Sequence, residues 1–255
     1  MRPARVILTR NLQVYRHQPA LLAITLAAPL GMMLLFGYVF GGSLSDGQGA
    51  AYRAFIVPGM FVLVAAMGLI ATASTANADL RAGVTDRFRS LPIPSASVPT
   101  GLVLAETIAG TAALALMGGL GLAVGWRIEG GIGEAALAVV VLILARWALS
   151  WLGIAIGATV RDEQMLQQVA PLIFGFIMLS NVFVPTQTMP MVVRQIAEWN
   201  PVSSFVEAAR QLFGNAVSLP SDTAWPLQHP VAASLIWVGA LTALATPAVV
   251  RNYRS

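Results

Sequence analysis

The chain has 255 residues, of which 57% are hydrophobic and 10% are charged, and its formal net charge is +4. Soluble globular domains carry about 25% charged residues, so this composition predicts a protein embedded in a membrane. All basic residues are arginine and cysteine is absent, which excludes a P-loop lysine, a lysine nucleophile, a disulfide and a cysteine metal site from this chain.

Two further partner classes find no support in the sequence. The arginines are scattered along the chain and form no patch interleaved with aromatic residues, so nucleic acid is not an expected partner. The two histidines, His17 and His229, lie far apart in sequence. The sequence therefore predicts no metal site and no cofactor on this chain.

The first predicted element is an amphipathic helix over residues 4–18, in which apolar residues such as Val6 and Leu12 stand among arginines. A basic amphipathic helix typically lies along the membrane surface, where each arginine gains about 1 kcal/mol from anionic headgroups. Two interpretations are open: the helix is a basic anchor that only fixes orientation, or it is an elbow beside a partner subunit.

Six stretches are long and apolar enough to cross a membrane. A helix needs about 20 mainly apolar residues to span roughly 30 Å of hydrocarbon, where only intrahelical hydrogen bonds satisfy its backbone. The sequence therefore predicts an all-α integral membrane protein, a single domain over residues 1–255, with six transmembrane helices. These cover approximately residues 20–40, 55–76, 101–126, 134–160, 165–184 and 231–250.

The arginines between these stretches lie mostly on one side of the predicted membrane. Cytoplasmic loops carry an excess of basic residues, and an even number of spans puts both termini on one side. Ten arginines against four therefore predict that both termini are cytoplasmic. The ten are Arg2, Arg5, Arg10, Arg16, Arg81, Arg87, Arg89, Arg161, Arg251 and Arg254, and the four are Arg53, Arg127, Arg194 and Arg210.

The predicted inner loop over residues 79–94 combines charge with an apolar stripe. Leu80, Val84, Phe88 and Leu91 recur at helical spacing, which predicts a short helix that the following prolines end. The helix either docks a cytoplasmic partner or belongs to a loop that only signals orientation. For docking, the candidate contacts are Phe88 and the charged residues Asp79, Arg81, Asp86, Arg87 and Arg89.

A second inner loop covers only residues 161–164 and contains Asp162 and Glu163. Such a cluster is either an ordinary set of charges at a helix end or a second contact point for the same partner. The docking hypothesis therefore includes both acidic residues.

Two ionisable residues, Glu106 and Arg146, fall inside predicted spans. An ionisable group at mid-span costs about 2.5–3.5 kcal/mol on insertion scales, so each of the two should have a partner. Their depths are close enough for an arginine side chain to bridge. The pair is either a structural salt bridge between adjacent helices or part of a polar substrate path or proton relay.

Methionine and phenylalanine side chains in the spans are candidates for a substrate path. Thioether and aromatic groups repack around varied apolar ligands, although the alternative for each residue is ordinary packing or lipid contact. The candidates are Met32, Met33, Phe36, Met60, Met67, Phe174, Phe176 and Met178.

The outer segment over residues 185–230 contains two predicted helices. The first covers 190–199, and the second begins at Ser204, which has capping-box spacing to Glu207. We expect both helices to dip into the outer leaflet, with apolar faces toward lipid. Their polar faces would carry Arg194, Glu198, Glu207 and Arg210.

Several segments together resemble a known family. They are Gln18-Pro-Ala-Leu-Leu22 after a basic stretch, Phe36-Gly-Tyr-Val-Phe-Gly41, Leu91-Pro-Ile-Pro94, Phe183-Val-Pro185, Met189-Pro190, and Asn200-Pro201 followed by Arg210. In this order the chain resembles the permease subunits of type-2 ABC exporters, and among them the bacterial daunorubicin-resistance-like permeases.

This resemblance implies a permease dimer, of identical or different chains, bound to two ATPase subunits that carry ATP and magnesium. The permease itself would not be an enzyme. The loop around 79–91 would be the coupling helix, and the outer helices would lie at the exit of a path between the two copies. The chain would lie in the bacterial inner (plasma) membrane and export a drug, lipid, glycolipid or polysaccharide.

Two other functions are alternatives to an export permease. An ion-coupled secondary transporter would use Glu106 and Arg146 as its transport residues. An intramembrane enzyme would need paired carboxylates, a Ser–His arrangement or a metal cluster, and the sequence offers none of these constellations.

Overall fold

The structure, a computed structural model, describes residues 27, 29–35, 49–83, 97–160 and 162–254. Regular structure within these residues is helical throughout and includes no strand, so the all-α prediction is confirmed for this part of the chain. The amphipathic helix predicted over 4–18 lies outside the described residues.

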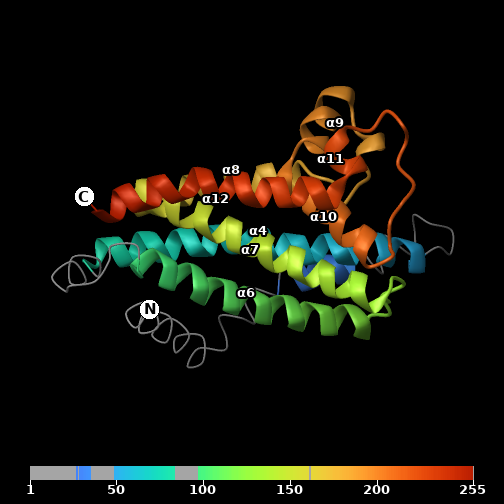
Figure 1. Cartoon of the computed structure of the whole chain (residues 1–255), viewed down its shortest axis with the longest axis horizontal. Coiled ribbons are helices and arrows are strands. Elements are labelled where there is room, and N and C mark those ends of the chain that lie inside the picture. The colour runs from blue at the N-terminus through green and yellow to red at the C-terminus, as the bar shows by residue number, and fades with distance from the viewer. Residues whose placement is uncertain (1–26, 28, 36–48, 84–96, 161, 255) are drawn as a thin grey trace.

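Four long helices run side by side along the length of the molecule (Figure 1). We call the end of this bundle that holds Arg81 and Glu163 the inner end, because the arginine distribution predicts that it is cytoplasmic. The opposite end, with the connection over residues 124–131, is the outer end. The four helices are α4 (Gly49–Arg81), α6 (Ser97–Ala123), α7 (Ile132–Thr159) and α12 (Pro230–Arg254).

These four helices are long and apolar enough to cross a membrane, and they match four of the six predicted spans. Of the predicted first span, residues 27 and 29–35 are described, and they are helical. The fifth is shorter than predicted: α8 (Glu163–Met178) has 16 residues and ends before 184. Its end is fixed by Asn200, whose Nδ2 donates to the carbonyls of Phe176 and Leu179. The count of six spans stays a prediction.

Helix α4 forms the centre of the bundle and contacts α6, α7, α8 and the outer helix α10. It is apolar around its whole circumference, which is typical of a helix buried on all sides. Residues Phe55 to Ala66 are buried without interruption. The helix also continues further inward than predicted, so Asp79 and Arg81 lie on its last turn, before the turn at Gly83.

Small residues let α7 approach α4 closely. A Cβ atom on Gly157 would lie 2.2 Å from the carbonyl oxygen of Ala73, and one on Gly153 would lie 2.6 Å from that of Leu69. Asn77 fastens the same contact, since its Nδ2 donates to the carbonyls of Gly157 and Val160. Glycines four residues apart commonly mark such close helix contacts in membranes.

We expect Gly157→Ala to lower the free energy of unfolding by about 1–3 kcal/mol, because the new methyl group collides with the α4 backbone. Unfolding of the purified chain in mixed SDS–detergent micelles measures the change. Gly118→Ala is the matched control, since a Cβ atom there meets nothing within 4 Å. Equal stability of the two variants would contradict the close contact.

Three short outer helices follow α8: α9 (Met191–Glu198), α10 (Pro201–Leu212) and α11 (Trp225–Gln228). Of these, α9 and α11 stand off one side of the bundle at its outer end (Figure 1), whereas α10 packs against α4, α7 and α12. The predicted start of the second helix at Ser204 is wrong. Asn200 caps α10 by accepting a hydrogen bond from Val202 N, and Pro201 occupies its first turn, so Ser204 lies inside the helix.

The connection between α6 and α7 is fixed against the end of α10. The backbone N–H groups of Glu129 and Gly130 donate to Phe213 O at 2.9 and 3.0 Å. Gly214 has a φ of +78°, and a Cβ atom there would lie 2.3 Å from Gly130 N. Glycine is therefore needed at position 214 both for its backbone conformation and for this contact.

Candidate functional site

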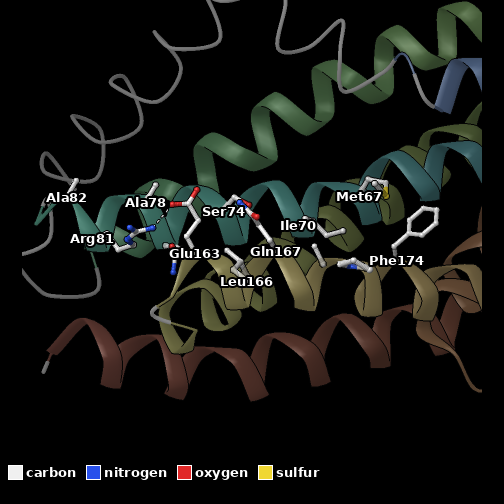
Figure 2. Close-up of a pocket in the computed structure, with 13 residues that line it drawn as sticks. Met67, Ile70, Ser74, Ala78, Arg81, Ala82, Glu163, Leu166, Gln167 and Phe174 are labelled. Atoms are coloured by element: carbon white, nitrogen blue, oxygen red, sulfur yellow. Dashed lines mark hydrogen bonds and ion pairs between the residues drawn. The ribbon is translucent and has the colours of Figure 1, made fainter.

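A groove of about 930 Å³ lies between α4 and α8 (Figure 2). Its inner end is polar, with Arg81 and Glu163, and further along the bundle it becomes apolar, with Met67 and Phe174 at the far end. Such a gradient suits a molecule with one polar and one apolar end. The other lining residues are Ile70, Ser74, Asn77, Ala78, Ala82, Leu166, Gln167, Ala170 and Pro171.

The inner end of the groove joins residues from both predicted inner loops. Arg81 Nη1 forms a salt bridge with Glu163 Oε2, and both side chains are more than half exposed. Asp162 caps α8, since its Oδ1 accepts a hydrogen bond from Gln164 N at 2.9 Å. The salt bridge therefore links the last turn of α4 to the first turn of α8.

Of the remaining docking candidates, the structure describes one. Asp79 is half-buried on the last turn of α4. Asp86, Arg87, Phe88 and Arg89 lie outside the described residues, as does the whole predicted inner helix from residue 84 onward.

The substrate-path candidates divide between the groove and the core. Met67 and Phe174 line the groove, whereas Met33 and Met60 are fully buried in the hydrophobic core. Met60 lies in the core because other helices enclose α4 at that level. Met32 and Met178 are partly buried against the same core, Phe176 is exposed, and Phe36 lies outside the described residues.

Glu106 and Arg146 meet inside the bundle. Arg146 Nη2 donates to Glu106 Oε2 at 2.9 Å, and both side chains are almost completely buried. Arg146 also donates through Nε to Glu106 O and through Nη2 to Thr72 Oγ1, each at 3.3 Å. One arginine of α7 thus connects α6 and α4 through polar contacts in an apolar bundle.

Two glycines make room for this arginine. A Cβ atom on Gly68 of α4 would lie 2.0 Å from Arg146 Nη1, and one on Gly110 of α6 would lie 2.4 Å from Arg146 Nε. The ion pair is predicted from the sequence, whereas the role of these glycines is not. A glycine in an apolar helix is common, and only the path of the arginine shows why these two positions stay without a side chain.

A second buried cation, Arg210, holds the outer helices to the bundle. Its Nε donates to Phe55 O at 2.9 Å, and its Nη2 donates to Asn181 O at 2.8 Å and Val182 O at 3.2 Å. Its Cζ lies 3.6 Å from the centre of the Phe55 ring. Burial lowers the pKa of Arg210 to about 10, so the side chain stays charged at neutral pH.

The predicted polar faces of the outer helices are therefore wrong for three of the four charges. Arg210, Glu207 and Glu198 are buried inside the protein rather than turned to water or headgroups. Glu198 accepts from Arg194 Nε at 2.7 Å and from Ala224 N at 2.9 Å, which fixes α9 against the segment before α11. Hydrogen bonds of these buried charged residues thus stabilise the short outer helices.

Comparison with known proteins assigns the chain to a family. A family model described as "ABC-2 type transporter" matches residues 3–213, which include α4 to α10. The chain belongs to the ABC-2 type transporter family. The resemblance read from the sequence is thereby confirmed.

One relative of this ABC-2 chain is the daunorubicin resistance ABC transporter permease protein DrrB1 of Streptomyces coeruleorubidus. The two are 29% identical over 249 residues, which cover 97% of this chain and 84% of the relative. The ABC-2 chain is accordingly a membrane permease, the non-catalytic membrane component of an ABC transporter. Among its described residues, no group of three His, Asp or Glu side chains could hold a metal ion.

Proposed function

We propose that this ABC-2 permease moves an amphipathic drug, lipid or glycolipid out of the cytoplasm and is powered by a separate ATPase subunit. Two permease copies would assemble with two ATPase subunits, which bind ATP and magnesium. The membrane would be the bacterial inner membrane, with both termini in the cytoplasm. The observation that carries this proposal is the groove between α4 and α8.

The groove suits a cargo that enters from the inner end. Polar groups of the cargo would meet Arg81 and Glu163, and its apolar part would pass along α8 toward Met67 and Phe174. Methionine and aromatic side chains adapt to ligands of different shape, so this end of the groove suits cargoes whose apolar parts differ in shape. The name of the relative, a daunorubicin resistance permease, favours a drug as one such cargo.

The salt bridge between Arg81 and Glu163 supports a route for coupling. The end of α4 leads into the inner loop that resembles a coupling helix, and the salt bridge ties this end to the start of α8. A movement that the ATPase imposes on the loop would thus reach both walls of the groove.

Charge reversal tests this route. We expect Arg81→Glu to lower cargo-stimulated ATP turnover of the reconstituted complex about fivefold or more, because the two like charges separate α4 from α8. The double variant Arg81→Glu/Glu163→Arg should recover most of the turnover. Global stability should change by less than about 1 kcal/mol, since exposed ion pairs contribute little.

Arg127→Glu is the matched control for the charge change, because Arg127 is exposed at the outer end of the bundle. It should leave turnover unchanged. Full activity of Arg81→Glu, or a double variant no better than the single one, would contradict coupling through this salt bridge.

The burial of Glu106 and Arg146 favours their structural role over ion-coupled transport. Both side chains are at least 96% buried, and Gly68 of α4 and Gly110 of α6 lie against the Arg146 guanidinium. A proton or ion relay would need access for water to at least one of the pair.

A further inference from the structure

A second cavity, of about 490 Å³, lies at the outer end between α10 and the segment that leads to α12. Its polar lining residues are Glu207, Gln211, Ser221 and Gln228, and its apolar ones include Val217 and Leu227. No arginine or histidine lines it among the described residues. The groove between α4 and α8 shares no lining residue with it.

Glu207 lines this cavity and has one carboxylate oxygen without a hydrogen bond from the described residues. The residue is only 4% exposed, and both of its hydrogen bonds fall on Oε2, from Asn181 Nδ2 at 3.1 Å and from Arg210 Nη1 at 3.4 Å. Oε1 accepts no hydrogen bond from the residues that the structure describes. An ionised carboxylate can accept about four hydrogen bonds, so Glu207 has capacity left for a ligand.

Arg210 offsets the charge of Glu207 only in part. Its contact with Glu207 is the longest of its four hydrogen bonds, and the other three go to backbone carbonyls. Burial raises the pKa of the Glu207 carboxyl, although Arg210 and Asn181 act in the opposite direction. A further cation beside this carboxylate would therefore stabilise its ionised form.

Gln228 adds a second acceptor to the lining. Its Nε2 donates to Ser221 O at 3.1 Å and to Thr223 O at 2.6 Å. Both amide hydrogens are engaged by these contacts, so the side-chain oxygen is the group left to meet a ligand. The cavity thus offers hydrogen-bond acceptors, a negative charge and apolar surface.

We propose that this outer cavity binds a ligand that carries a protonated amine. The ammonium group donates to Glu207, with the amide oxygens of the lining as further acceptors, and the apolar body of the ligand lies against Val217 and Leu227. An ammonium group has three donors and no acceptor, which matches this lining. That the cavity receives exported cargo rests on the proposed function, whereas amine binding does not.

A binding assay without any ATPase tests the site. Dansylcadaverine, a fluorescent primary amine, and its neutral N-acetyl derivative are titrated against the purified chain in lipid nanodiscs. We expect the amine to bind about ten- to a hundredfold more tightly, as a charge-assisted hydrogen bond implies, and Glu207→Gln to remove this difference. Equal binding of both compounds, or a preference that persists in Glu207→Gln, would overturn the proposal.

A second variant covers the case that Glu207→Gln does not fold. Gln211 is exposed and lies one turn after Glu207, so Gln211→Arg places a competing guanidinium in the cavity without altering the buried network. It should abolish the preference for the amine. Gln195→Arg, with the same charge change on the exposed face of α9, should leave it intact.

Equal loss in both arginine variants would show general repulsion of cations and would overturn a specific site. The assay also separates this proposal from the export function. If the unchanged chain shows no preference for the amine but ATP-driven export is intact, the amine site is ruled out and the proposed function stands. If the unchanged chain prefers the amine but does not export, the proposed function fails and the amine site stands.

Discussion

Replacing Arg146 with methionine is expected to lower the free energy of unfolding by about 3–5 kcal/mol. Methionine fills much of the same volume, so the loss comes mainly from Glu106, which would keep a buried charge without its partner at 2.9 Å. Thr72 and the carbonyl of Glu106 would also lose a donor. Equilibrium unfolding in mixed SDS–detergent micelles measures the change.

The double variant Glu106→Gln/Arg146→Met shows whether the lost stability comes from the charge that the single variant leaves unpaired. Replacing both partners of a buried ion pair is often nearly neutral, so we expect it to recover most of the stability that the single variant loses. If Arg146→Met is as stable as the unchanged chain, the pair does not hold α4, α6 and α7 together.

Arg210→Met should be similarly costly, with a loss of at least about 3 kcal/mol. The carbonyls of Phe55, Asn181 and Val182 lose their donor, and Glu207 loses its neighbouring cation. Because Arg210 joins α10 to α4 and to the segment after α8, the damage should be local. Amide hydrogen exchange should therefore increase in α10 before it increases in α7.

Arg251→Met serves as the control for Arg210→Met, since Arg251 is exposed near the end of α12. It should change stability by less than about 0.5 kcal/mol. Uniform acceleration of exchange along the chain in Arg210→Met, or none at all, would contradict a local role in holding the outer helices.

The spans and the central ion pair could be predicted from the sequence because each depends on one strong constraint. A long apolar run has few alternatives to a membrane helix, and four such runs match α4, α6, α7 and α12. A charge inside such a run requires a partner, which led to Glu106 and Arg146 as a pair. Neither conclusion needs the packing of side chains to be known.

The outer charges could not be predicted in the same way. On a short helix, Glu207 and Arg210 are spaced like residues of a solvated face, and only the contacts with Phe55 and Asn181 bury them. The start of α10 differs from the predicted one for a related reason. Ser204 and Glu207 have the spacing of a capping box, but Asn200 and Pro201 provide a cap one turn earlier.

The length of α8 also depended on tertiary structure. Its apolar sequence continues past Met178, and the continuation predicted a helix as far as 184. In the structure the amide of Asn200 binds the last carbonyls of α8, so the helix ends and the chain turns toward the outer helices.

The proposal of an ATP-driven export permease is tested most directly by transport into inverted proteoliposomes. Vesicles contain this chain alone or together with its ATPase subunit, and accumulation of daunorubicin, the drug in the name of the relative, is followed by fluorescence. We predict accumulation only with both subunits and hydrolysable ATP. Accumulation by this chain alone, driven by a pH gradient and abolished by Glu106→Gln, would contradict the proposal.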